Sequence, residues 1–220
     1  GFTVDDPGYL FTVSMADEYE EQKENVRGFL EEICRHECGF SASVICSDQW
    51  KKVYLIIYRV YEARTWKEYF QKNVVTGLCR KFPGTIICVW IETKQLTKLE
   101  EAMIQTGSLM EWNLLQPRGV LICQQTVEKF EVVPVRYPVE LEQRMREMIF
   151  DENKKGIARQ FQLVCEEMKR EKYFPKEIKY SIIRFCMAAG LNYRNYGGQI
   201  DETEILSLMQ QITYAISWKQ

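Results

Sequence analysis

Carboxylates stand at two places where a two-metal centre would need them. Asp17 follows the first predicted strand, and Asp48 lies in the turn 46–50 of a predicted hairpin. Two-metal nucleotidyl chemistry needs carboxylates that converge on one point. In this order of elements, Asp17 and Asp48 could fall near each other. A solvated helix start also explains the acidic run from Asp17 to Glu21, because acidic side chains favour helix N-termini.

The most metal-like cluster is formed by Cys34, His36 and Cys38, and His36 is the only histidine in the chain. Cys34 and Cys38 are four positions apart and share a helix face, whereas His36 points elsewhere. A structural zinc site needs four ligands, and the sequence has no second pair at matching spacing. We therefore predict no metal site, and we interpret the cluster as a helix C-terminus.

Nucleophilic and nucleotide-binding motifs are absent from the sequence. A Ser-His-Asp or Cys-His arrangement would have to use His36, which lies in a charged helix end without a serine elbow. The sequence has neither a Gly-x-Gly-x-x-Gly motif nor a P-loop. We predict no catalytic residue and no cofactor.

Composition indicates a folded protein with a sizeable core, since 46% of the 220 residues are hydrophobic and 13% aromatic. The net charge of −2 gives no overall basic excess of the kind that marks a nucleic-acid-binding domain. No apolar run approaches the roughly 18 residues of a membrane span. Most of the eight cysteines lie in apolar strand or helix patterns, which favours reduced thiols in a cytoplasmic protein.

The residues that could do chemistry must be positioned by alternating strands and helices in the first half of the chain. We predict strands at 8–15, 40–46, 51–60, 85–92 and 120–124, and helices at 16–39, at 62–82 and from about Leu96. Apolar stripes at helical spacing support the first two helices, through Val26, Phe29, Leu30 and Ile33, then Trp66, Phe70, Val74 and Leu78. The first six elements have the split βαβ order of a ferredoxin-like plait.

After Val127 the pattern changes to a linker, 128–138, with two prolines, followed by helices as far as residue 220. We expect helix starts at Pro138, at Pro175 and at the Asp201-x-x-Glu204 signal, and a loop at 192–198. The last residues, 212–220, are expected to lie mid-helix. The sequence thus predicts an α+β domain at 1–130 and an all-helical segment at 131–220.

The predicted plait with its hairpin resembles the GGDEF-type nucleotide cyclase fold. That family carries Gly-Gly-Asp/Glu-Glu-Phe in the turn, where this chain has Cys46-Ser47-Asp48-Gln49-Trp50. The resemblance implies that the turn acids and an Asp after the first strand would hold metals. Only Asp48 matches the turn, and Ala16 or, with a one-residue shift, Asp17 stands at the other position. The resemblance therefore implies a degenerate domain that is not an enzyme.

A resemblance covering nearly the whole chain is to the middle region of AraC-type, YesN-like response regulators. It is carried by 102–122, which resembles the third helix and last strand of their GGDEF-like domain, and by 136–175, which resembles their following helix pair. Such regulators place a receiver domain before this region and a helix-turn-helix domain after it, so we interpret the sequence as a fragment.

The resemblance implies a non-catalytic signal-relay and dimerisation module of a transcription regulator. Its expected partner is a second copy, and it would reach DNA only through the absent C-terminal helix-turn-helix domain. An alternative is a small-molecule sensor that binds a nucleotide or a sugar without turnover. Asp48, Trp50 and Lys52 would line its pocket in the degenerate cyclase cleft.

Overall fold

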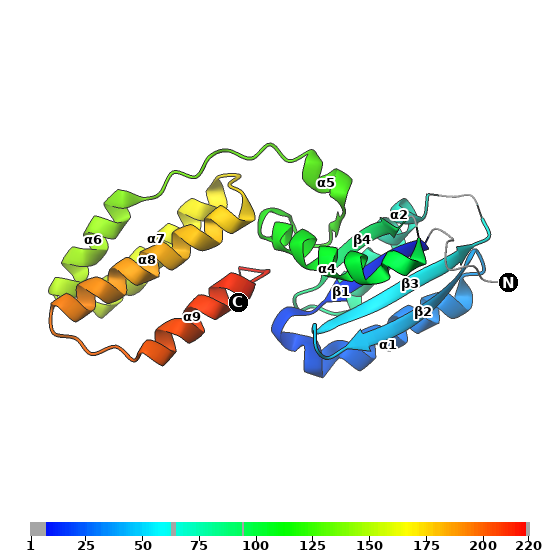
Figure 1. Cartoon of the computed structure of the whole chain (residues 1–220), viewed down its shortest axis with the longest axis horizontal. Coiled ribbons are helices and arrows are strands. Elements are labelled where there is room, and N and C mark those ends of the chain that lie inside the picture. The colour runs from blue at the N-terminus through cyan, green and yellow to red at the C-terminus, as the bar shows by residue number, and fades with distance from the viewer. Residues whose placement is uncertain (1–7, 63–64, 94, 219–220) are drawn as a thin grey trace. The chain divides into compact units, whose positions relative to one another are not determined.

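The computed structural model describes residues 8–62, 65–93 and 95–218 (Figure 1). The described chain divides into two units between Phe130 and Glu131. The first unit contains a mixed sheet covered by helices, and the second contains helices, so the α+β class expected from the sequence is confirmed. Residues 1–7 and 219–220 of the two predicted domains lie outside the described residues.

The sheet has five strands in the order β2-β3-β1-β4-β5, where β4 and β5 pair in parallel and the other neighbours are antiparallel. The strands are β1 (Gly8–Ser14), β2 (Phe40–Ser47), β3 (Lys52–Val60), β4 (Ile87–Thr93) and β5 (Leu121–Ile122). The central strand β1 is buried on both faces, which explains its nearly continuous apolar sequence.

One face of the sheet packs against α1 (Tyr19–His36) and a second helical segment made of α2 (Trp66–Tyr69), the π-helical turn η2 (Phe70–Val75) and α3 (Thr76–Lys81). The predicted stripe of Trp66, Phe70, Val74 and Leu78 is buried throughout. Alternate strand residues meet this stripe, because side chains along a strand point to opposite faces. The strand residues in this core are Phe11, Val13, Phe40, Val53, Leu55, Ile57, Cys88, Trp90 and Leu121.

The opposite face packs against α4 (Leu99–Met110), which contacts β1 and β4 (Figure 1). A 3-10 turn, η3 (Leu96–Lys98), leads into α4, and another, η4 (Glu111–Leu115), follows it. Ala102, Thr106, Leu109 and Met110 of α4 are buried. The two faces of the sheet are therefore covered by different helices.

The end of the first unit differs from the sequence prediction. The strand predicted at 120–124 is only Leu121–Ile122, and α5 (Gln124–Glu128) follows at once. The carbonyl of Cys123 accepts hydrogen bonds from Thr126 N and Val127 N, and this turn ends the strand. The side chain of Gln71 fixes the approach to β5, since it donates to Gly119 O (2.9 Å) and accepts from Leu121 N (2.6 Å).

The second unit consists of α6 (Val139–Phe150), α7 (Lys154–Arg170), α8 (Pro175–Asn195) and α9 (Glu202–Tyr214). Its core is formed by the inward residues of α6, α7 and α8, namely Met145, Ile149, Val164, Met168, Ile178, Ile182 and Phe185. The predicted starts are observed: Pro138 is the N-cap of α6, Pro175 begins α8, and the Asp201 carboxylate accepts from Thr203 N at the start of α9.

Two boundaries in this unit were predicted wrongly. Helix α8 continues to Asn195, so the first half of the loop predicted at 192–198 is helical, and Gly197 turns the chain at a φ of 85°. Helix α9 ends at Tyr214 rather than continuing through the last described residues. Lys179 Nζ donates to Thr213 O at 2.7 Å and satisfies a carbonyl at this helix end. That contact spans 34 positions, and local sequence patterns do not reveal it.

Candidate functional site

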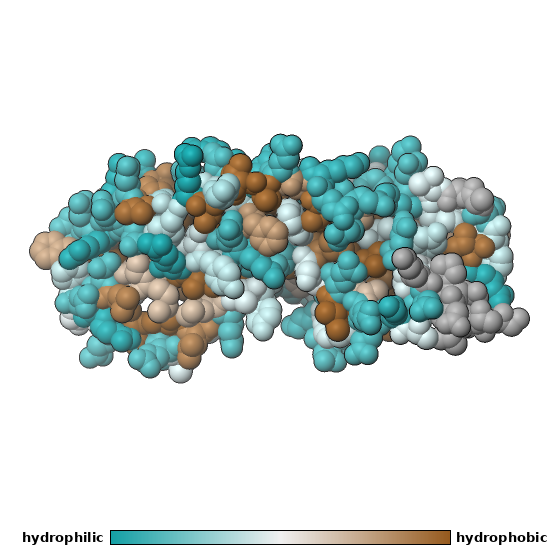
Figure 2. Space-filling model, turned by 45° about the horizontal axis from the view of Figure 1, so that its top comes forward, coloured by the Kyte–Doolittle hydropathy of each residue, from teal (hydrophilic) through white to brown (hydrophobic). Residues whose placement is uncertain are grey.

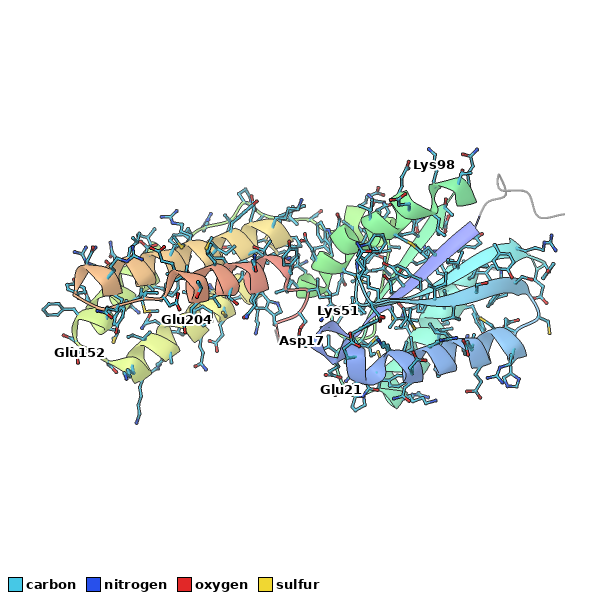
Figure 3. All side chains as sticks on the ribbon, turned by 60° about the horizontal axis from the view of Figure 1, so that its bottom comes forward. Asp17, Glu21, Lys51, Lys98, Glu152 and Glu204 are labelled. Atoms are coloured by element: carbon cyan, nitrogen blue, oxygen red, sulfur yellow. The ribbon has the colours of Figure 1, made fainter. Side chains whose placement is uncertain are left out.

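The hairpin turn between β2 and β3 is where the sequence places its candidate chemistry. Asp48, Gln49, Trp50 and Lys51 connect the strands, and Lys51 adopts a left-handed conformation with a φ of 48°. Ser47 Oγ accepts a hydrogen bond from Trp50 N at 3.4 Å inside the turn. Asp17 and Lys51 lie at the same end of the first unit, where the turn meets the start of α1 (Figure 3).

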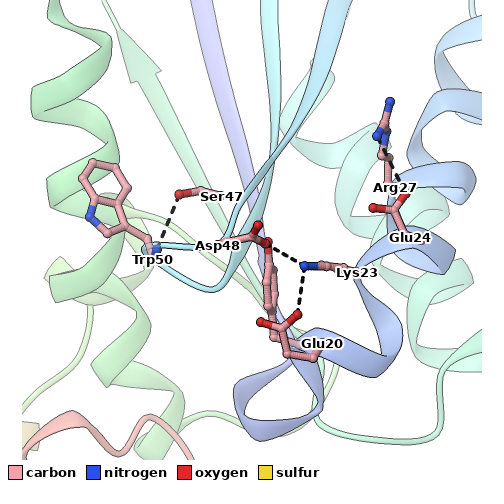
Figure 4. A network of polar contacts seen from close by, with 8 residues as sticks. Glu20, Lys23, Glu24, Arg27, Ser47, Asp48 and Trp50 are labelled. Carbon is pink, nitrogen blue, oxygen red and sulfur yellow. Dashed lines mark hydrogen bonds and ion pairs between the residues drawn. The ribbon is translucent and has the colours of Figure 1, made fainter.

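The Asp48 carboxylate is held by α1 (Figure 4). Lys23 Nζ lies 2.7 Å from Asp48 Oδ1 and 2.8 Å from Glu20 Oε2. Tyr19 OH donates to the same Asp48 oxygen at 3.1 Å. The hydrogen bonds from Lys23 and Tyr19 hold the pKa of Asp48 below its usual range. Asp48 thus connects the hairpin turn to the first turns of α1.

Trp50 and Lys52 lie on the other side of the hairpin from Asp48. Figure 4 shows Trp50 directed away from Lys23, and its ring meets the edge of Tyr54, with centroids 6.1 Å apart. A Cβ at Gly107 of α4 would lie 3.8 Å from Lys52 Nζ. Asp48 therefore faces α1, while Trp50 and Lys52 lie on the α4 face. The structure does not bring the three predicted ligand-binding residues together.

The residues considered for metal chemistry are spread out. Asp17 is exposed in the 3-10 turn before α1, and His36 is the last residue of that helix. Cys34 is half-buried, Cys38 is exposed, and all eight cysteines are free. In the part of the chain that the structure describes, no group of three or more His, Cys, Asp or Glu side chains could hold a metal ion.

Sequence reasoning missed a groove of about 290 Å³ between α8 and α9. We call it the α8–α9 groove. Arg194 and Glu202 flank it and form an ion pair at 3.5 Å. Leu191 and Leu206 are 56% and 60% exposed, which is high for leucine. Its apolar walls are Met187, Leu191, Ile205, Leu206 and Met209.

Helix α9 packs weakly within its own unit, since none of its 13 residues is buried. Isolated helices shorter than about 12–15 residues are marginal in water, so α9 needs packing to stabilise it. A signal was available in the sequence, because Leu206 widens the apolar stripe that Ile205, Leu208, Met209 and Ile212 form at helical spacing. With about 100° per residue, these five positions span an apolar arc of about 160°. One neighbouring helix covers only the middle of such an arc.

A second depression, of about 720 Å³, lies between the C-terminal ends of α6 and α8. Phe150 is 66% exposed there, and its ring meets the edge of Tyr196 with centroids 5.2 Å apart. Arg146, Glu147 and Asp151 give the lining both signs of charge. Apolar side chains also reach the surface elsewhere in the helical unit, in the left half of Figure 2. The mixed lining selects no particular ligand chemistry.

Comparison of the chain with protein-family models, with curated proteins and with solved structures finds no match. Among the helices of the described residues, none has both the length and the apolar character that crossing a membrane requires.

Proposed function

We propose that this chain is a non-catalytic regulatory region of a bacterial AraC-type, YesN-like transcription regulator. It dimerises through its helical unit and relays a cytoplasmic signal to the helix-turn-helix domain that such regulators carry. The observation that carries this proposal is the α8–α9 groove. Its leucines, Leu191 of α8 and Leu206 of α9, remain more than half exposed, and α9 has no buried residue.

The strand order supports a GGDEF-like plait as the framework of the first unit. The neighbours β2-β3-β1-β4 are all antiparallel, with α1 between β1 and β2 and the α2–α3 segment between β3 and β4. This is the arrangement that a split βαβ pattern produces. The fifth strand adds to the β4 edge in parallel.

The contacts of Asp48 support a structural role for the hairpin turn. In the family that the sequence resembles, the acids of this turn hold metals. Here the Asp48 oxygen accepts from Lys23 and Tyr19, and Gln49 at the next position has no charge with which to bind a metal. A carboxylate paired with a lysine is already neutralised, so this turn serves to join the hairpin to α1.

A second copy of the chain is the occupant that fits the α8–α9 groove. Arg194 and Glu202 neutralise each other at its rim, so two identical surfaces meet without like-charge repulsion. An isologous interface requires such self-complementarity. The resulting two-fold axis would match palindromic half-sites on DNA.

The proposal is tested by fusing the chain to a monomeric helix-turn-helix domain and measuring binding to DNA with one or two half-sites. We expect strong cooperativity on two half-sites, and we expect Leu206→Glu to abolish it. Ser207→Glu is the matched control, because it adds the same charge about 100° away on the helix. A fusion that is monomeric at high concentration and binds both DNAs equally per half-site would show the proposal to be wrong.

A further inference from the structure

Lys52 is the first residue of β3, and its ammonium lies over α4. The side chain is half-buried. Within the described part of the chain it makes neither an ion pair nor a hydrogen bond. Burial lowers the pKa of Lys52, because a desolvated ammonium without a counter-charge is disfavoured. Lys52 is therefore a cation that the described structure does not neutralise.

The space opposite the ammonium is kept open by a glycine. A Cβ added at Gly107 would meet Lys52 Nζ at 3.8 Å and would have no other atom within 4 Å beyond its chain neighbours and its own helix backbone. The φ of Gly107 lies outside the positive range, so its backbone conformation does not require glycine. The missing side chain leaves room beside the ammonium.

Two enclosed hydroxyl groups belong to the same sheet face. Tyr54 follows Lys52 by two positions, and the β1–β3 register places Thr12 opposite Tyr54. Both residues are 0% exposed. Thr12 Oγ1 has no hydrogen-bond partner in the described residues, which is uncommon for buried polar groups, whereas Tyr54 OH has the Thr106 side chain of α4 beside it. The Trp50 ring packs on the Tyr54 ring beside them.

We propose that this face binds the oxyanion of a small phosphorylated ligand, with the phosphate on the Lys52 ammonium beside Gly107. A phosphate offers several acceptor oxygens, and an ammonium offers three donors. The Trp50 ring supplies a surface on which the rest of the ligand stacks. Asp48 takes no part, because its carboxylate faces α1 and would repel the anion.

This site keeps Trp50 and Lys52 of the predicted cleft and leaves out Asp48, and its use does not require the dimer. A simpler role for Lys52 is that its stem packs on the sheet while its head remains in water. The two roles predict different responses to phosphate, because a solvated lysine binds the ion no better than its neighbours do.

The test is a titration of the whole chain with inorganic phosphate, followed by NMR at the Gly107 amide and the Trp50 indole. Sodium chloride at matched ionic strength is the blank. We expect saturable shifts at both groups, and we expect Lys52→Met to weaken binding by about tenfold or more. Gly107→Ala should also weaken it, because the new methyl group lies next to the ammonium. Lys51→Met removes the neighbouring charge and should change the affinity by less than about twofold.

Lys52→Met should also keep or raise the melting temperature, because it removes a charge that burial disfavours. An unchanged or higher melting temperature then serves as the control that the variant is folded. Titration with adenosine monophosphate tests the stacking. Tighter binding than phosphate, lost in Trp50→Ala, supports the role of Trp50, whereas equal affinity rejects that role. Absence of saturable shifts, or equal losses in Lys51→Met and Lys52→Met, would overturn the proposed site. The phosphate titration is repeated on Leu206→Glu, the variant expected to break the dimer. Phosphate binding that persists in this variant shows that the Lys52 site works without dimerisation, so the two proposals are tested separately.

Discussion

Truncation of Leu206 gives the most direct test of the α8–α9 groove as a dimer interface. Leu206 is 60% exposed, so a little over half of its side chain is available for burial by a partner. Complete burial of a leucine side chain stabilises by about 1.5–3 kcal/mol. The available part is therefore worth about 1–2 kcal/mol in each protomer.

An isologous dimer buries Leu206 once in each protomer, so the stabilisation from this side chain is doubled. Leu206→Ala should then weaken dimerisation by about 2–4 kcal/mol, which is roughly 30-fold to 700-fold in Kd. Leu206→Glu should weaken it further, because the interface would also have to bury a carboxylate.

Sedimentation equilibrium over a wide concentration range measures the Kd, and circular dichroism checks that the helices remain formed. Ser207→Glu introduces a charge at the next position, on the helix face opposite the apolar stripe. We expect the dimerisation Kd of this variant to equal that of the parent chain. Equal shifts for Leu206→Ala and Ser207→Glu, or no shift for Leu206→Ala, would refute the reasoning.

Three further predictions concern the first unit. Lys51→Gly should stabilise the unit by about 0.5–1 kcal/mol in urea unfolding, because a left-handed conformation disfavours residues with a Cβ. Lys51→Ala keeps the Cβ and therefore the strain, and an equal gain in stability for Lys51→Ala would contradict this explanation. Phe70→Ala should destabilise the unit by about 3–5 kcal/mol, since the Phe70 ring is 0% exposed among Phe11, Phe40 and Trp90. If Phe70→Ala loses no more unfolding free energy than Phe70→Leu, the core collapses around the missing ring and this prediction is wrong. The folded-state pKa of Asp48 is lowered, so its contribution is present at neutral pH and is lost as pH falls below about 4. The difference in unfolding free energy between the parent chain and Asp48→Asn should therefore shrink in acid, and a difference independent of pH would reject the Lys23 contact.

Local sequence patterns predicted most of the elements of the first unit. The spacing of Trp66, Phe70, Val74 and Leu78 identified the second helical segment, and all four side chains are buried. Such patterns succeed because a helix face or a strand face is defined by residues a few positions apart. The same reasoning found the helix starts at Pro175 and Asp201, whose effects are also local.

Local sequence patterns did not predict how the three candidate ligand-binding residues are oriented. Asp48, Trp50 and Lys52 are spaced two apart, which suggests one face of an extended chain. The turn between them breaks that alternation, with Lys51 in a left-handed conformation. Which helix then covers each side depends on contacts between elements distant in sequence, such as those of Tyr19 and Lys23 in α1 with Asp48 in the turn.

The sequence by itself determined the α+β class, most of the helical segments and the residues of the core stripes in the first unit, because these depend on periodicity within each element. The tertiary structure decided which predicted site residues lie together, where α9 ends and which leucines remain exposed. Lys179 reaches Thr213 O across 34 positions, and the exposure of Leu206 depends on how much of α9 its neighbour α8 covers. Long-range packing sets both features, and no window of neighbouring residues contains it.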